Sequence, residues 1–191
     1  MDDGISNKPK FQLSEFYKKN KKKIISAILV IITSIIILVI IDDYKKKKNI
    51  DISKKFNEAK ILIEKNSPKE ALKMLEIIIF KKNNFYSPSA LNLIIDNNLI
   101  KDKNKILSYY DQIISNNKLD LEIKNLFILK KIIYLGDDIK ENELLNSLKP
   151  LIQSDSLWKN TASDYIKKYY ISKGEFNKAK EFEFSNTQIN E

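Results

Sequence analysis

One apolar run limits the possible structures of this chain more than any other feature. Residues 24–41 carry no charged side chain, and 14 of these 18 residues are Ile, Leu or Val. As a helix rising about 1.5 Å per residue, the run is roughly 27 Å long, close to the ~30 Å hydrocarbon core of a bilayer. A cleaved signal peptide would have a shorter apolar region, of about 7–15 residues, followed by small residues. This run instead ends in Ile40-Ile41-Asp42-Asp43-Tyr44. We therefore expect a retained transmembrane helix rather than a signal peptide or a buried core helix.

Lysines flank the run on both sides. The 20 residues before it and the 20 residues after it each contain seven lysines, so the positive-inside rule gives no orientation. We expect these lysines to reach the lipid headgroups and do not interpret them as a nucleic-acid arm. The predicted order is a short lysine-rich tail (residues 1–23), the transmembrane helix (24–41) and a charged juxtamembrane collar (42–50).

The composition excludes much chemistry. The chain has no His, no Cys and only three Gly. It therefore cannot supply a thiolate nucleophile, an imidazole base, a zinc site of the usual ligands or a glycine-rich phosphate loop. Of the net charge of +9, residues 1–48 carry +6, so the basic balance belongs to the membrane flanks. We expect no enzyme activity, no cofactor and no nucleic-acid partner.

Residues 51–184 have a helical pattern throughout. Ile52, Phe56, Ala59 and Ile63 recur at spacings of three and four, which indicates one buried helix face. Similar segments follow, and no window shows the strict alternation of a strand. Eight helices are predicted, separated by breaks at Ser67-Pro68, before Ser87-Pro88 and Asp102, and at Asn116-Asn117, Gly136-Asp137-Asp138, Asp155-Ser156 and Gly174. The fold class is therefore all-α, and residues 185–191 are expected to form a polar tail.

A recurring turn suggests that the helices are stacked in pairs. Ala71 and Ala179 each lie five residues after a turn former, Asn66 and Gly174. The two alanines are 108 residues apart, or three steps of about 36, near the roughly 34 of a tetratricopeptide-type repeat. In such repeats a small residue allows close helix crossing, and an aromatic such as Phe176 fills the gap between pairs. The intermediate steps reach Leu107 and Glu143, beside Leu144, so we expect a degenerate tetratricopeptide-like domain of helical hairpins.

Three groups of residues are candidates for a site. One group is aromatic and could line a peptide groove, although core packing is favoured at helical spacing: Tyr109, Tyr110, Trp158, Tyr165, Tyr169 and Tyr170. A second group is acidic and could bind a hard cation, although a solvated turn and helix N-terminus is favoured: Asp137, Asp138, Glu141 and Glu143. Asp42-Asp43 beside Lys45–Lys48 is expected to form a solvated collar. No catalytic, cofactor-binding or metal-ligating residue is predicted.

The order of tail, spanning helix, collar and tetratricopeptide-like domain resembles the YfgM-like family, the ancillary subunit of the bacterial SecYEG translocon. Three segments look like parts of alphaproteobacterial members: Phe85-Tyr86-Ser87-Pro88-Ser89-Ala90-Leu91, Trp158-Lys159-Asn160-Thr161-Ala162 and Tyr170-Ile171-Ser172-Lys173-Gly174-Glu175-Phe176. The resemblance implies a single-pass protein of the bacterial inner membrane, with a cytoplasmic amino terminus and a periplasmic domain. It also implies contacts with translocon subunits and transfer of emerging chains to periplasmic chaperones.

The leading hypothesis is therefore a membrane-anchored protein–protein interaction module. The alternative is an envelope scaffold or a regulator of division or stress signalling that uses the same kind of adaptor domain. A third hypothesis is a carboxylate-based hydrolase built on Asp137, Asp138 and Glu141, because carboxylates are the main acid–base groups in the composition.

Overall fold

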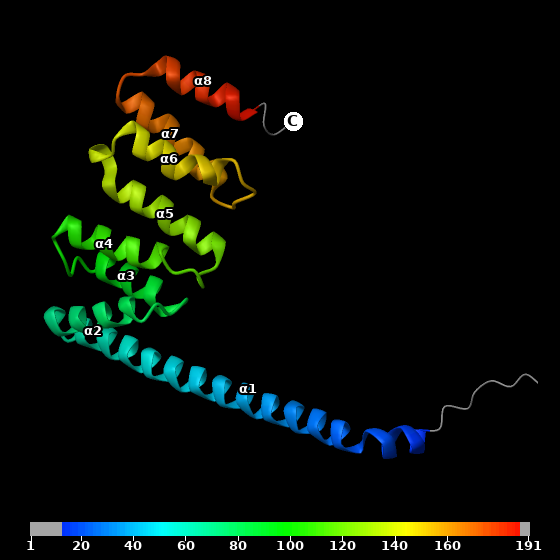
Figure 1. The fold of residues 1–191 in the computed structure, drawn as a ribbon. Helices are drawn as coiled ribbons and strands as arrows, with labels where there is room; N and C mark the ends of the chain where they lie inside the picture. The colour runs from blue at the N-terminus through cyan, green and yellow to red at the C-terminus, as the bar shows by residue number, and fades with distance from the viewer. Residues whose placement is uncertain (1–12, 188–191) are drawn as a thin grey trace, which may run out of the picture. The chain divides into compact units, whose positions relative to one another are not determined.

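The computed structural model describes residues 13–187, and the side chains of residues 20–182. Within this range the chain is all-α, as predicted, and carries eight helices (Figure 1). The elements in order are α1 (Leu13–Glu64), α2 (Pro68–Phe80), α3 (Tyr86–Asp96), α4 (Lys103–Ile114), α5 (Leu121–Leu135), a 3-10 turn (Gly136–Asp138), α6 (Glu141–Ile152), α7 (Lys159–Ser172) and α8 (Phe176–Thr187). The chain divides between Ile50 and Asp51 into two compact units.

The described part of the first unit is the amino-terminal part of α1. This helix continues without interruption for 52 residues. Residues 13–23, expected as tail, and residues 42–50, expected as collar, are therefore helical; residues 1–12 lie outside the described range. The collar can continue the helix because Asp42 and Asp43 pair with Lys46 and Lys47 one turn later, at 2.8 Å in both cases. The segment from Asn20 to Glu64 is long and apolar enough to cross a membrane, as an anchor or a signal sequence would be.

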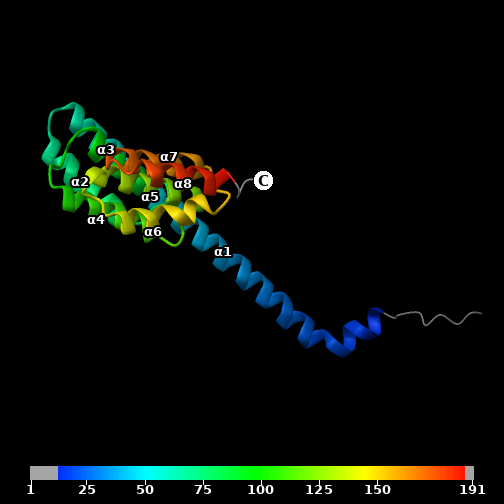
Figure 2. The same cartoon turned by 90° about the horizontal axis from the view of Figure 1, so that it is seen from above.

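The second unit consists of helical hairpins. Residues 51–64 of α1 form the first hairpin with α2, and the following hairpins are α3–α4, α5–α6 and α7–α8. Each helix from α2 onward packs on the next one along the chain, and α2 also packs on α4. The connections within hairpins lie on one edge of this unit and those between hairpins on the opposite edge (Figure 1). Seen from above, α3 to α8 overlap as layers of a stack (Figure 2).

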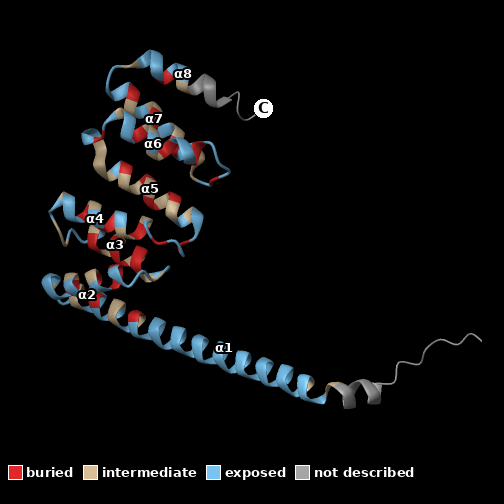
Figure 3. Cartoon of the chain, viewed as in Figure 1, coloured by how far each residue is buried: buried red, intermediate tan, exposed pale blue. Residues whose placement is uncertain are grey.

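The apolar core of this unit is divided into two clusters. The first is formed by the first hairpin, α3 and α4, with Leu119 and Phe127; the second is formed by α6 and α7, with Leu129, Ile132, Ile139 and Ala179. The buried residues follow the contacts between adjacent layers (Figure 3). Helix α5 contributes to both clusters and therefore joins the two halves of the domain.

Three of the four turns within hairpins have the same backbone form. Asn66, Asn98 and Gly174 all have a positive φ, of 59°, 50° and 77°. After each of them, the next amide donates to the carbonyl five residues earlier, as in the Schellman motif that ends many helices. These bonds run from Ser67 to Leu62, from Leu99 to Ile94 and from Glu175 to Tyr170, at 2.8, 3.0 and 2.8 Å. The turn after α5 differs, because Gly136 leads into a 3-10 turn.

Because the turns differ in length, the equivalent residues of the hairpins are not separated by the constant step of 36 residues that the sequence predicted. The fourth residues of α2, α4, α6 and α8 are Ala71, Ile106, Leu144 and Ala179; all four are buried, and each donates the first helical hydrogen bond of its helix. Leu107 and Glu143, reached by steps of 36, are therefore each one position away from the equivalent residue. Asp102, at a predicted helix start, caps α4 by accepting a bond from the Lys105 amide, whereas the Ser67 side chain makes no capping bond.

The shared turn gives a test at Gly174. A Cβ added there would meet no atom within 4 Å, so the effect of a substitution is conformational. We expect Gly174→Val to lower the free energy of unfolding by about 1–2 kcal/mol, because a side chain at positive φ is strained. Gly174→Asn should lower it less, because Asn66 and Asn98 already adopt this conformation. Urea unfolding of the full chain in detergent measures both values, and equal losses would contradict the equivalence of the turns.

Candidate functional site

The aromatic residues considered as a candidate peptide groove instead pack between helices. Tyr109, Tyr110 and Tyr170 are buried. The ring of Tyr110 lies 6.0 Å from those of both Phe127 and Tyr134, and Trp158 donates from Nε1 to the Glu122 carbonyl at 3.0 Å. The favoured interpretation of these aromatics as packing residues is therefore confirmed.

The tyrosines of α7 tie this helix to the preceding hairpin. The Tyr165 and Tyr169 hydroxyls donate to the carbonyls of Ile132 and Ile139, each at 3.4 Å. The Tyr170 hydroxyl donates to Oε1 of Glu141 at 3.0 Å. Burial, together with this carboxylate, raises the pKa of Tyr170 to about 12. The hydroxyl therefore stays protonated and remains a donor at neutral pH.

The predicted acidic cluster forms ion pairs rather than a cation site. Asp138 pairs with Lys103 of α4, Glu141 pairs with Lys178 of α8, and Glu143 is exposed on α6. Over the described residues, no three His, Cys, Asp or Glu side chains are placed to hold a metal ion. Asp138 and Glu141 therefore connect neighbouring hairpins through lysines.

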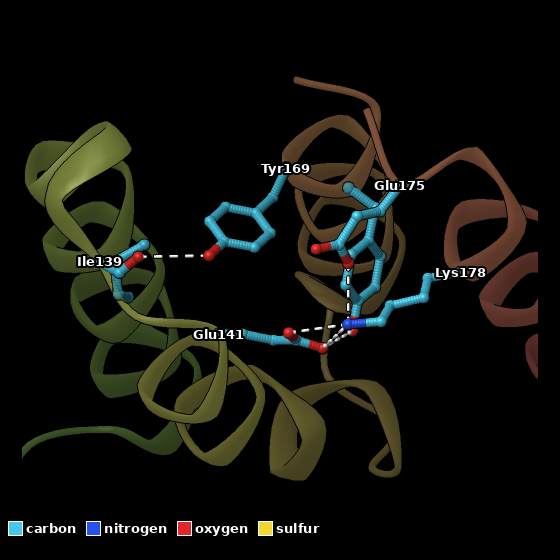
Figure 4. A network of polar contacts seen from close by, with 6 residues as sticks. Ile139, Glu141, Tyr169, Glu175 and Lys178 are labelled. Atoms are coloured by element: carbon cyan, nitrogen blue, oxygen red, sulfur yellow. Dashed lines mark hydrogen bonds and ion pairs between the residues drawn. The ribbon is translucent and has the colours of Figure 1, made fainter. Parts of the chain in front are cut away.

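Glu141 and Lys178 form the centre of a polar network at the last hairpin (Figure 4). Lys178 Nζ lies 2.9 Å from both carboxylate oxygens of Glu141 and 2.8 Å from Oε2 of Glu175. The bond from Lys178, helped by Tyr170 and opposed by burial, lowers the pKa of Glu141. The bonds that Lys178 donates to Glu175 and Glu141 raise the pKa of Lys178. Both groups are thus charged at neutral pH, and the network holds α6, α7 and α8 together.

A second polar network, which the sequence did not predict, joins the connections between hairpins. Glu122 accepts hydrogen bonds from the Ser156 hydroxyl and the Leu157 amide, both at 2.9 Å. One layer earlier, Asn116 donates to the Lys82 carbonyl and to the Asn84 side chain, both at 3.1 Å. The partners lie about one repeat apart in sequence, so no local pattern could have revealed them.

An open apolar groove lies between α7 and α8. Its volume is about 510 Å³, and its apolar floor is formed by Ile171, Phe176 and Ala179. The Ile171 and Phe176 side chains are 51% and 60% exposed, so Phe176 does not fill a gap between hairpins as the repeat pattern predicted. Three lysines and one aspartate complete the lining: Lys167, Lys168, Lys180 and Asp164. We call this site the α7–α8 groove.

A second groove of about 600 Å³ lies on α2 and has similar chemistry. Ile77 and Phe80 are its exposed apolar residues, and Lys73, Glu76 and Lys81 complete the lining. The Phe80 ring also stands edge-on to the ring of Tyr109 at 6.2 Å. Both grooves can accept an apolar side chain of a partner, and their lysines can meet negative charge on that partner.

No family model, curated protein or solved structure matches the chain. The two grooves and the apolar helix are therefore the features that point to a function.

The Glu141 network predicts a pH-dependent loss of stability. The pKa of the Glu141 carboxyl is lower in the folded state than its ordinary value of 4.5. The ion pair therefore stabilises the fold fully above pH 4.5, and this stabilisation is lost as the pH falls through the folded-state pKa. We expect Glu141→Gln to lower the melting temperature of the full chain at pH 7 by a few degrees. The difference from the wild-type chain should be smaller at pH 3 than at pH 7.

Glu143→Gln is the matched control, because Glu143 lies two residues away and is exposed. This variant should change the melting temperature little at either pH. A Glu141→Gln effect of the same size at pH 7 and pH 3 would contradict the ion pair with Lys178 as its source.

Proposed function

We propose that this chain is a membrane-anchored protein–protein interaction module with a degenerate tetratricopeptide-like domain and no catalytic activity. The observation that carries the proposal is the spacing of the bonds between layers. Among the described residues, side-chain hydrogen bonds between layers recur between residues 29–38 positions apart, close to the length of one such repeat. Examples are Tyr109–Glu76, Asn116–Lys82, Trp158–Glu122 and Lys178–Glu141.

This spacing matters because it describes an open stack rather than a closed bundle. In a stack each hairpin is bonded to its neighbours, and the outer surfaces of successive helices form an extended binding surface. The α2 groove and the α7–α8 groove lie on the first and last hairpins of this stack. Both combine exposed apolar side chains with lysines, which suits protein partners that carry apolar and acidic residues.

The apolar helix supports the anchored form of the proposal. A domain attached to a bilayer meets other membrane proteins at a high effective concentration. Contacts that are weak in solution can then be sufficient. The narrower proposal, from the resemblance to YfgM-like proteins, is an ancillary subunit of the Sec translocon in the bacterial inner membrane, with its domain in the periplasm.

In-cell crosslinking tests this proposal. A photoreactive benzoylphenylalanine is placed at Ile77 or at Ile171, in the two grooves, and at the exposed Asn146 of α6 as a control. We expect adducts with translocon subunits and periplasmic chaperones from the groove positions, identified by mass spectrometry, and few from Asn146.

The other outcomes separate the parts of the proposal. Adducts with division or stress-signalling proteins of the envelope would favour the alternative function. Adducts with cytoplasmic proteins alone would overturn the periplasmic orientation and the translocon assignment. A lack of protein adducts from both groove positions would refute the interaction module.

A further inference from the structure

The α7–α8 groove occupies the position at which the stack would continue. The turn of the last hairpin repeats that of the first: the bonds from Lys65 to Ile61, Asn66 to Ile63 and Ser67 to Leu62 recur from Lys173 to Tyr169, Gly174 to Ile171 and Glu175 to Tyr170. The first helical bond of α2, from Ala71 to Ser67, likewise recurs from Ala179 to Glu175 in α8. Each pair of equivalent residues is separated by the same 108 positions, so the two hairpins can be compared residue by residue.

In the first hairpin, the equivalent surface holds a helix. Helix α3 packs on α2, and the Tyr86 ring of α3 lies 5.6 Å from the ring of Phe56. Ala59, Ile63 and Leu72 belong to the apolar cluster that α3 completes. This surface of a hairpin is therefore where the next helix of the stack is seated.

The last hairpin keeps only part of the apolar floor of that seat. Ile171 stands at the position of Ile63, and Ala179 at that of Ala71. Since no further hairpin follows among the described residues, Ile171 stays 51% exposed. Exposed apolar side chains gathered on one surface mark an interaction site, so the exposed Ile171 and Phe176 point to an occupant.

The rest of the seat has changed from apolar to charged, and Asp164 stands at the position of Phe56, the ring that Tyr86 contacts. Lys167 replaces the equivalent of Ala59, and Lys180 replaces the equivalent of Leu72. The third lysine is unchanged, because Lys168 stands at the position of Lys60 in the first hairpin. Asp164, the one acid of the lining, is paired with Lys167 at 3.3 Å. Two exposed lysines, Lys168 and Lys180, are thus left around the floor without a second acid in the lining.

We propose that the α7–α8 groove binds an acidic amphipathic helix of a partner protein, seated as the next helix of the stack. The apolar face of the helix would cover Ile171, Phe176 and Ala179, and its carboxylates would face Lys168 and Lys180. Such a helix would bind by the helix-in-groove mode, with electrostatic complementarity setting the choice of partner. The proposal rests on the proposed function and adds the site, the conformation and the charge of the partner.

The test uses a stapled, fluorescent peptide that carries the apolar face of α3 (Tyr86–Asp96) and has glutamate at its polar positions. Its binding to the full chain in neutral detergent micelles is measured by fluorescence anisotropy. A second peptide has lysine in place of the glutamates. We expect the acidic peptide to bind at least about tenfold more tightly than the basic one, with the difference shrinking at high salt.

Two double variants locate the binding site. Lys168→Glu with Lys180→Glu should weaken binding of the acidic peptide at least about tenfold and should strengthen binding of the basic peptide. The matched control, Lys73→Glu with Lys81→Glu, makes the same charge change in the α2 groove and should alter binding by less than about twofold. Circular dichroism melting checks that both variants fold.

Three results would overturn the inference: equal binding of the two peptides, no loss in the Lys168→Glu/Lys180→Glu variant, or an equal loss in the control variant. The inference would also be overturned if the groove of the wild-type chain bound anionic lipid vesicles in preference to the acidic peptide. That result would assign the lysines to a membrane surface. Crosslinking separates this failure from failure of the proposed function. Protein adducts from Ile77 would preserve the interaction module even if the α7–α8 groove bound no acidic helix.

Discussion

The domain depends on burial between neighbouring layers, because the helices have no common centre around which to pack. Each hairpin covers an apolar face of the next, and the two apolar clusters meet on α5. Phe127 of α5 belongs to the first cluster, while Leu129 and Ile132 belong to the second. With burial worth about 25 cal/mol per Å² of apolar surface, these contacts are the main source of stability. The open groove at the last hairpin follows from the same arrangement, since a stack exposes the face on which another layer could be placed.

Polar bonds at the edges of the stack complement this non-directional burial. An apolar contact allows a helix to slide by one turn, whereas a hydrogen bond requires particular atoms to meet. Glu122 accepts bonds from the hydroxyl of Ser156 and the amide of Leu157 at the edge between hairpins. Lys178 meets Glu141 near the opposite edge. The two networks therefore fix the register of the hairpins.

Features that arise within one helix or turn could be predicted from the sequence, and features that depend on distant partners could not. The spacing of Ile52, Phe56 and Ala59 and the break at Asn66-Ser67-Pro68 are local, so the all-α class and the helical hairpins were predicted correctly. The uninterrupted α1 was not, because its lysine-rich collar resembles an interfacial segment as much as a helix. The register of the middle hairpins was displaced by one residue because the turns differ in length. The groove at Phe176 was missed, since a repeat pattern assigns an aromatic to the interior.

The layered arrangement also determines how the domain responds to mechanical force. Each hairpin is bonded to its neighbours, and α8 has a neighbour on one side only among the described helices. Tension applied at the carboxy-terminal end would therefore break the contacts of α8 before those of the inner hairpins. The Lys178 network, which joins α8 to α6, is the first polar connection to carry that load. The domain would unzip from its end, layer by layer, rather than rupture in one step.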